Sequence, residues 1–375
     1  MKSPLIQRVV LVLISVVVSI ALAEVILRIW PPSSLQHKAV RRADPVFHHS
    51  LIPSSRYVAH NPDFTVEVRT NSLGFRDREH SNDPSEAYNI IVLGDSFVEG
   101  YGVPVESCFV HRLESQLNAD TIHSRPTTLY NFGVAGYSPV IEYLVLKHRG
   151  LALKPNMVIL CYDMNDVQED VLYAQDAEFD STGMPLKINP SWPSFGTVAT
   201  LPRSVFKTYL QEHSYVYSLL ASFVNRAKPA TVVEPGNIDA SRYAHSVDST
   251  AERWQKFFEQ SQSYVKMIRD LCSSNGITFV LVTYPRGHQV NPVEWTVGRK
   301  YSGLDSLTPN SAIFASLQLF AQTNAISFLN MTPTFRSHSK GDLYYPYDGH
   351  WTSAGHALAA EKLYEFLISN HLLPN

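Results

Sequence analysis

The sequence predicts a doubly wound parallel α/β sheet. Short apolar runs, typical of strands buried on both faces, recur along the chain, and stretches with helical spacing separate them. Strands that alternate with helices in this way favour a parallel sheet covered by helices. The expected strands are residues 90–93, 128–132, 157–162, 277–282 and 326–329. The main expected helices are residues 141–149, 252–272 and 354–368.

Composition limits the class of protein. The chain has 375 residues, of which 45% are hydrophobic and 17% charged, so it is globular and too polar for many membrane spans. Its net charge of -3 gives no strong field of one sign, and we expect no nucleic-acid partner. Cys108, Cys161 and Cys272 lie far apart, which predicts neither a zinc site nor a disulfide framework. The sequence has no phosphate-binding glycine loop and no dinucleotide fingerprint, so no cofactor is expected.

The N-terminus carries a candidate membrane segment. An apolar stretch over residues 9–23 follows Arg8, and apolar residues continue after Glu24 as far as Trp30. This pattern is typical of a signal peptide cleaved near Ala23, which would give a secreted protein, or of a single anchoring helix. Because the apolar character continues past the cleavage point, we expect a single-pass anchor in the cell membrane, with the folded domain outside the cytoplasm.

The remaining chain divides into a linker and one domain. We expect residues 1–30 to be the anchor or signal peptide, 31–60 a linker, and 61–375 the folded domain. Residues 64–69 alternate apolar and polar side chains, as a half-buried strand does. From about 167 to 250 the alternation of strands and helices stops and Tyr, Pro and Trp become frequent, which predicts a large insertion.

A serine directly follows the first buried strand. Gly94, Asp95 and Ser96 form a turn between this strand and the next helix. In open α/β sheets, ligands bind beyond the carboxyl ends of the strands. A helix N-terminus at that position also supplies free N–H groups and the positive end of a dipole, both of which stabilise an oxyanion. The alternative is that Ser96 only caps the helix.

Several short motifs resemble those of the SGNH/GDSL hydrolases. Residues 94–100 (GDSFVEG) resemble the first block of that family, and residues 131–137 (NFGVAGY) resemble the second. Asn165-Asp166 resembles the third block, and Asp348-Gly349-His350 resembles the last, whose usual form is Asp-x-x-His. The motifs stand in the family's order from about residue 89 to the C-terminus, with the insertion left out. The resemblance implies the flavodoxin-like sheet of the SGNH hydrolase fold and a serine esterase activity.

The same resemblance implies a role for each catalytic side chain. Ser96 would be the nucleophile, His350 its general base, and Asp348 the acid that orients the imidazole. The shortened Asp-x-His spacing requires an extended or turned loop if both side chains are to reach one site. His356 is the first substitute for His350, although its place at a helix start favours a structural role.

The oxyanion would be held by three hydrogen-bond donors. These are the Ser96 N–H, the Gly136 N–H and the Asn165 side-chain amide, with Gly133 as the alternative to Gly136. Asn165 is equally typical of a helix cap. His288 follows the fourth strand and lies on the ligand side of the sheet.

Three functions are compatible with these residues. The first is a membrane-tethered, exported esterase that hydrolyses an O-acyl group, plausibly O-acetyl, on a small molecule or glycan through an acyl-serine. The second is an O-acyltransferase with the same triad and a sugar hydroxyl as acceptor. The third is a binding domain that keeps the fold without catalysis, which the presence of Ser96, Asn165, Asp348 and His350 disfavours.

Overall fold

The structure is a computed structural model, and it describes residues 4–29, 41–80, 84–120, 125–190, 214, 216–217, 252–304 and 312–374. The chain divides into two units, one comprising residues 1–39 and 193–234 and the other comprising residues 40–192 and 235–375. The expected linker over residues 31–40 and most of the expected insertion, including residues 191–213 and 218–251, lie outside the described residues.

The larger unit is built on a parallel sheet of five strands in the order β11-β10-β7-β5-β6. Numbered along the chain within the sheet, this order is 2-1-3-4-5, which is the flavodoxin-like arrangement, so the predicted fold class is confirmed. The strands are β5 (Tyr88–Gly94), β6 (Thr127–Gly133), β7 (Met157–Tyr162), β10 (Thr278–Thr283) and β11 (Ser327–Asn330). In the register, Gly94 faces Gly133 and Thr283 faces Tyr162, so the carboxyl ends of four neighbouring strands meet at one edge.

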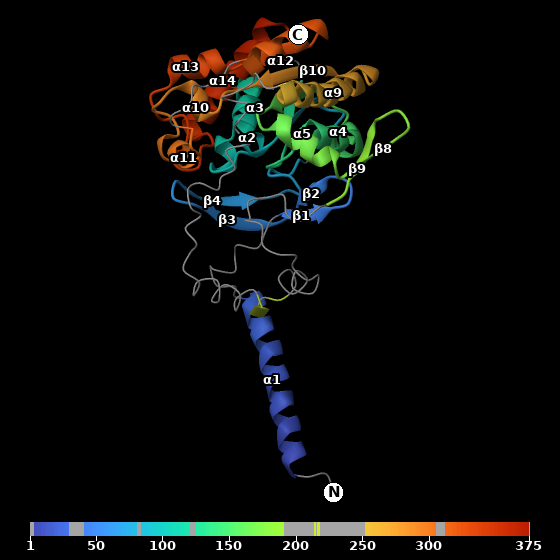
Figure 1. Ribbon diagram of the computed structural model, residues 1–375, viewed down its shortest axis with the longest axis vertical. Coiled ribbons are helices and arrows are strands. Elements are labelled where there is room, and N and C mark those ends of the chain that lie inside the picture. Colours follow the sequence, from blue (N-terminus) through green and yellow to red (C-terminus); the bar gives the residue numbers. More distant parts are fainter. Residues whose placement is uncertain are drawn as a thin grey trace. The chain divides into compact units, whose positions relative to one another are not determined.

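Helices flank this sheet in two groups. α14 (Ser353–Ser369) packs on α3 (Phe109–Ala119), while α9 (Glu252–Ser274) packs on α4 (Pro139–Val145) and α5 (Asp166–Ala174) (Figure 1). The apolar side chains of β5 from Ile90 to Leu93 are fully buried, as expected for a strand covered on both faces. The larger unit also contains, among the described residues, the α-helices α2 (Ser96–Glu99), α10 (Gly287–Val290), α11 (Thr296–Tyr301), α12 (Ala312–Thr323) and α13 (Thr332–His338).

Two β-hairpins precede the sheet, where the sequence indicated a linker. β1 (Arg41–Asp44) pairs with β2 (His48–Leu51), and β3 (Arg56–His60) pairs with β4 (Thr65–Arg69). The strand expected at 64–69 is therefore present, whereas residues 41–60 are strands and not a linker. Their short, polar sequences, such as RRAD and HHSL, lack the alternation on which strand prediction depends.

The beginning of the expected insertion is also regular. Residues 167–188 hold most of α5 and an antiparallel pair formed by β8 (Ala177–Phe179) and β9 (Pro185–Ile188).

The three cysteines are buried and form no disulfide, and burial raises the pKa of each thiol. They are therefore small core residues and not nucleophiles.

α1 (Pro4–Ile29) belongs to the other unit. Its 26 residues give a helix of roughly 39 Å, against about 30 Å for the hydrocarbon core of a bilayer. The window Val10–Leu27 has a mean hydropathy of 2.9 and no buried residues. α1 is thus long and apolar enough to cross a membrane, a criterion that a signal sequence near an N-terminus also meets.

Candidate active site

The candidate residues lie at the carboxyl edge of the sheet. Ser96 follows β5, Gly136 follows β6, and Asn165 follows β7, and these three strands are neighbours. Arg286, which the sequence analysis did not single out, follows β10 at the same edge. This is the edge at which open α/β sheets bind their ligands.

The side chain of Asp95 caps the short helix that begins at Ser96. The N-cap of α2 is Asp95, whose carboxylate accepts the Phe97 N–H at 2.9 Å, so Ser96 is not the capping residue. The Ser96 side chain does not cap the helix and lies at the carboxyl edge of the sheet, and the residue is 9% exposed. A Cβ on Gly94 would lie 2.2 Å from Val98, so α2 can pack this close to β5 only above a glycine.

The predicted acid and base lie next to this serine. His350 Nε2 lies 2.7 Å from Ser96 Oγ, and His350 Nδ1 is hydrogen-bonded to Asp348 Oδ1. Because an ionised carboxylate only accepts hydrogen bonds, Nδ1 carries the proton and Nε2 is free to accept from the serine. Burial acts to raise the pKa of Asp348, but its electrostatic and hydrogen-bond interactions with His350, together with Arg286, hold that pKa below its ordinary value. Asp348 is therefore an anion beside the imidazole at neutral pH.

Gly349 makes the shortened spacing workable. Its φ of 86° is in the left-handed region, and this bend places Asp348 and His350 on the same side of the loop. A Cβ at Gly349 would also lie 2.6 Å from Trp295 Nε1. The structure thus brings Asp348, His350 and Ser96 together.

The structure distinguishes the two glycines considered for the oxyanion hole. The Gly133 N–H donates to the Asn131 side chain at 3.0 Å and is already used. The Gly136 N–H has no hydrogen-bond partner among the described residues, and Gly136 has a φ of 81°. Of these two glycines, Gly136 is therefore the one with an available donor, and its role in an oxyanion hole stays a prediction.

Neighbouring side chains fix the loop that carries Gly136. Glu99 Oε2 accepts the Ala135 N–H at 2.7 Å and also binds Arg41 at 3.0 Å. His49 Nε2 lies 3.1 Å from the Ala135 carbonyl, and the Tyr173 hydroxyl donates to the Gly136 carbonyl at 2.8 Å. Burial, together with the His48 and Arg41 charges, lowers the pKa of His49 to about 3, so this imidazole is neutral.

Arg286 orients Asn165. Asn165 stands at the start of α5 but makes no capping hydrogen bond with its side chain. Instead, its Oδ1 accepts from Arg286 Nη2 at 3.0 Å, which turns the amide nitrogen away from the arginine. Arg286 also donates through Nε to Asp163 at 3.1 Å, and its guanidinium lies 5.3 Å from the Phe97 ring centre. The sequence did contain a signal for Arg286, because a charged residue stands shortly after a buried strand. It lies in the segment 285–288 (PRGH), which also contains His288.

A second carboxyl lies behind the nucleophile. Burial and the neighbouring Asp163 raise the pKa of Asp95 well above its ordinary value. Asp95 accepts from the Phe97 N–H and, at 3.3 Å, from the Tyr284 hydroxyl. It braces the turn, as the sequence indicated, while Asp163 is the partner of Arg286.

Two further histidines are structural. His356 is 1% exposed, and its Nδ1 accepts the Phe109 N–H at the start of α3 at 3.3 Å. His288 is also 1% exposed and packs on Trp295, which leaves it no access to a substrate. His350 is thus the histidine that contacts Ser96.

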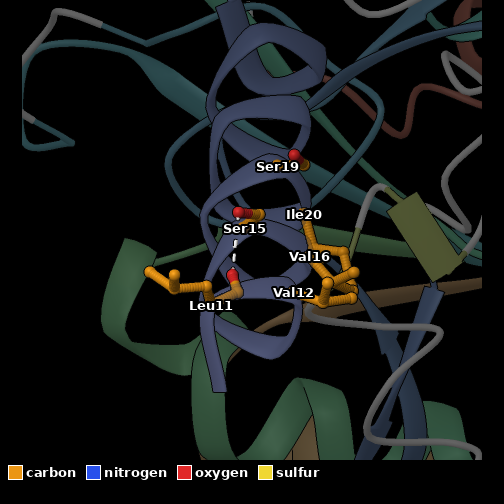
Figure 2. A pocket seen from close by; sticks show the side chains of 6 residues that line it. All are labelled: Leu11, Val12, Ser15, Val16, Ser19 and Ile20. Carbon is orange, nitrogen blue, oxygen red and sulfur yellow. Dashed lines mark hydrogen bonds between the residues drawn. The ribbon is translucent and has the colours of Figure 1, made fainter. Parts of the chain in front are cut away.

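A hollow on α1 is unrelated to these residues (Figure 2). All its lining side chains come from that helix, and Ser15 Oγ there donates to the Leu11 carbonyl at 2.9 Å. Its lining residues are Leu11, Val12, Ser15, Val16, Ser19 and Ile20. In the part of the chain that the structure describes, no group of three or more His, Cys, Asp or Glu could hold a metal ion.

The fold and the matched sequence profile define the class of the protein as a GDSL-type ester hydrolase. The profile of the GDSL-like lipase/acylhydrolase family matches residues 92–312. This match covers more than half of the chain, and the chain belongs to this family. The match includes Ser96, Gly136 and Asn165 but ends before Asp348 and His350.

The chain is also similar to several solved structures. A two-domain esterase active on acetylated mannans is 14% identical with a TM-score of 0.38, covering 78% of this chain and 53% of its own, so the chain spans about half of that protein's length. An acetylxylan esterase of Geobacillus stearothermophilus is 12% identical with a TM-score of 0.40, covering 75% of this chain and 94% of its own. The esterase EstA of a Pseudoalteromonas species is 11% identical with a TM-score of 0.37, and the match covers 76% of this chain and 100% of EstA. No functionally curated protein matches the chain.

Proposed function

We propose that the protein is an exported, membrane-tethered serine esterase that hydrolyses an O-acyl ester through an acyl-serine. The observation that carries the proposal is the line of contacts from Ser96 Oγ through His350 to Asp348, with 2.7 Å between Ser96 Oγ and His350 Nε2. The side chains of His350 and Asp348 are 19% and 15% exposed, so a substrate can reach them. A hydroxyl beside an imidazole that is held by a carboxylate is the arrangement that acyl transfer needs.

Acylation begins when Ser96 Oγ bonds to the ester carbonyl carbon while its proton passes to His350 Nε2. The oxyanion accepts hydrogen bonds from the Ser96 N–H, the Gly136 N–H and the Asn165 amide. Such donors typically contribute on the order of 3 kcal/mol each to transition-state stabilisation. The bond to the alcohol oxygen then breaks, and the leaving oxygen takes the proton from Nε2.

Deacylation repeats these steps with water. Water bonds to the acyl carbon as Nε2 takes its proton, the bond to Ser96 Oγ breaks, and Ser96 recovers the proton as the acid leaves. Asp348 stabilises the imidazolium in both halves of the cycle. A sugar hydroxyl in place of this water would give an acyltransferase.

The location suggests the substrate class. α1 is proposed to stay attached and to hold the catalytic domain outside the cytoplasm, where acylated glycans are accessible. An O-acetyl group on such a glycan is a simple ester that the proposed chemistry hydrolyses. The two relatives with activity on acetylated mannans or xylan are consistent with this choice, although their similarity concerns the fold alone.

The main test uses Ser96→Ala with 4-nitrophenyl acetate and a fluorophosphonate probe. We expect the wild type to take up one probe on Ser96 and the variant to lose both labelling and turnover while keeping its melting temperature. Ser115→Ala is the matched control, because Ser115 is exposed and bonds only the His111 carbonyl. Turnover by Ser96→Ala at the wild-type rate would refute the proposal. Adding a glycan acceptor and measuring acylated glycan against free acid separates hydrolysis from transfer.

The tether has its own test. Intact-mass measurement of the exported protein should give the full chain in the membrane fraction, because the apolar helix continues past Ala23. A mature N-terminus at Glu24 would show cleavage and remove the anchor.

A further inference from the structure

The Asp348 carboxylate has a second partner, contributed by the β3–β4 hairpin. Asn61 Nδ2 donates to Asp348 Oδ2 at 3.0 Å, while Asp348 Oδ1 is used by His350. Both oxygens of the carboxylate are thus held, which fixes its plane as well as its position. Asn61 precedes the range matched by the family profile and Asp348 follows it, so the profile covers neither partner.

The turn that carries Asn61 is itself well defined. Asn61 Oδ1 accepts the N–H groups of Asp63 and Phe64 at 2.9 and 3.1 Å. These two donors fix the oxygen side of the amide, and the nitrogen side therefore faces Asp348. The asparagine is oriented by its own turn before it contacts the catalytic loop.

The same turn also holds the backbone of the catalytic loop. Asp63 Oδ2 accepts the N–H groups of Asp348 at 2.7 Å and of Tyr347 at 3.0 Å. The Phe64 ring packs on Tyr345, with ring centres 5.1 Å apart. Asp63 and Phe64 therefore fix the loop, while Asn61 fixes the carboxylate.

We propose that Asn61 is a positioning residue for catalysis, which acts by holding the Asp348 carboxylate in the plane that His350 needs. This inference rests on the proposed function, since it requires Asp348 to act on His350. The physical reason is the short Asp-x-His spacing: a carboxylate only two residues from its histidine is carried on a tight bend. A donor from a distant hairpin keeps that carboxylate from rotating away. A hydrogen bond to a charged group is stronger than one between neutral groups.

Two variants separate the amide donor from the turn. Asn61→Asp keeps the oxygen that accepts the two N–H groups but replaces the donor facing Asp348 with a second carboxylate oxygen. Asn61→Ser keeps a turn-forming acceptor and is too short to reach Asp348. Thr65→Asp and Thr65→Ala are the controls, because Thr65 is exposed on the same hairpin and bonds only His60, at 2.7 Å.

Kinetics of the full-length chain on 4-nitrophenyl acetate give the test. We expect both Asn61 variants to lower kcat by roughly 10- to 100-fold with KM changed by less than about 2-fold, as for loss of a hydrogen bond to a charged group. In an Asp348→Ala background the same changes should alter kcat by less than about 2-fold, because a residue that acts through Asp348 has nothing left to position. A merely structural role would lower activity equally in both backgrounds. Melting temperatures of both variants show which of them is folded, and either one suffices for the test.

The outcomes separate this inference from the proposed function. If Asp348→Ala lowers kcat but both Asn61 variants turn over like the wild type, only the role of Asn61 is wrong. If the Asn61 effects persist undiminished without Asp348, that role is also wrong. If Asp348→Ala itself is fully active, the proposed acid and the positioning residue are both refuted.

Discussion

The nucleophile turn and the acid–base loop reach the same point in the molecule by different means. The turn from Gly94 to Gly100 closes through hydrogen bonds among its own residues, such as Glu99 N–H to the Asp95 carbonyl at 2.9 Å, and Arg76 Nη1 adds a hydrogen bond to the Glu99 carbonyl at 3.1 Å. The loop from Tyr345 to His350 depends on distant segments. Trp295 Nε1 donates to the Tyr347 carbonyl at 3.2 Å, and Asp63 accepts from the loop backbone.

This difference determines which substitutions will damage catalysis. Around Ser96, hydrogen bonds between sequence neighbours shape the turn, and the distant residues to which it is sensitive include Arg76 and Asn131, which donate to its carbonyls. The acid–base loop should be sensitive to residues that are remote in sequence and close in space. A short motif can therefore carry most of a nucleophile turn but only part of an acid–base pair.

Loss of the base should have the largest effect. We expect His350→Ala to lower kcat by at least about 10³-fold, since general-base catalysis and the unit that it forms with Ser96 are both lost. His356→Ala is the matched control, because it removes a nearby histidine that does not contact Ser96. The test compares the kcat of the two variants on 4-nitrophenyl acetate. An active His350→Ala beside an inactive His356→Ala would mean that the base is wrongly assigned, and the role of Asp348 would be lost with it.

Loss of the acid should cost less. We expect Asp348→Ala to lower kcat by roughly 10²-fold, because the imidazole keeps its base function while losing its charged partner. The ring remains packed between Phe97 and Tyr101, with ring centres 4.9 and 5.0 Å from that of His350. The double variant with His350→Ala should be no slower than His350→Ala alone, since the two residues act as a unit. A double variant that is slower by the full Asp348 factor would show that Asp348 acts independently.

Arg286 tests whether the residues near Ser96 also depend on a distant segment. If Asn165 depends on this residue from the β10 end, the oxyanion hole is not wholly local. We expect Arg286→Lys to keep the charge beside Asp163 but to lower kcat by about 10-fold, because an ammonium cannot bridge Asp163 and Asn165 as a guanidinium does. Arg269→Lys is the control, since Arg269 bonds only the backbone of Asn324 and its neighbour Asp270. An unchanged kcat would show that Asn165 keeps its orientation without Arg286.

Much of the fold and the position of Ser96 at the carboxyl edge of the sheet were predictable from local patterns. The sheet strands are short apolar runs, and Ser96 follows the first of them, so periodicity and the GDS motif were enough. The hairpins over residues 41–60 were missed because their strands are short and polar and are stabilised by pairing with each other. Arg286 and Asn61 were missed for a related reason. Their roles depend on partners 121 and 287 residues away in the sequence, and no local pattern encodes such a pair.

The last prediction concerns stability, and a contact between the two regions. His356, just after the acid–base loop, accepts the Phe109 N–H in the helix that follows the nucleophile turn. Burial, and secondarily the Arg76 charge, lowers its pKa from 6.5 to about 3. Between these values the unfolded chain binds a proton that the folded protein does not, so His356 makes stability fall as the pH drops below 6.5.

His356→Asn should remove this pH dependence while keeping an acceptor for the Phe109 N–H. At pH 7.5 the variant is expected to be less stable than the wild type, since it loses ring packing on Phe109 and Trp351. At pH 5 that deficit should shrink by about 2 kcal/mol, because only the wild type must keep a buried histidine neutral. Urea unfolding at the two pH values measures the change. Leu363→Ala, a buried substitution in the same helix, should show the same deficit at both pH values. If the deficit of His356→Asn were equally constant, His356 would not be the group that makes this contact sensitive to acid.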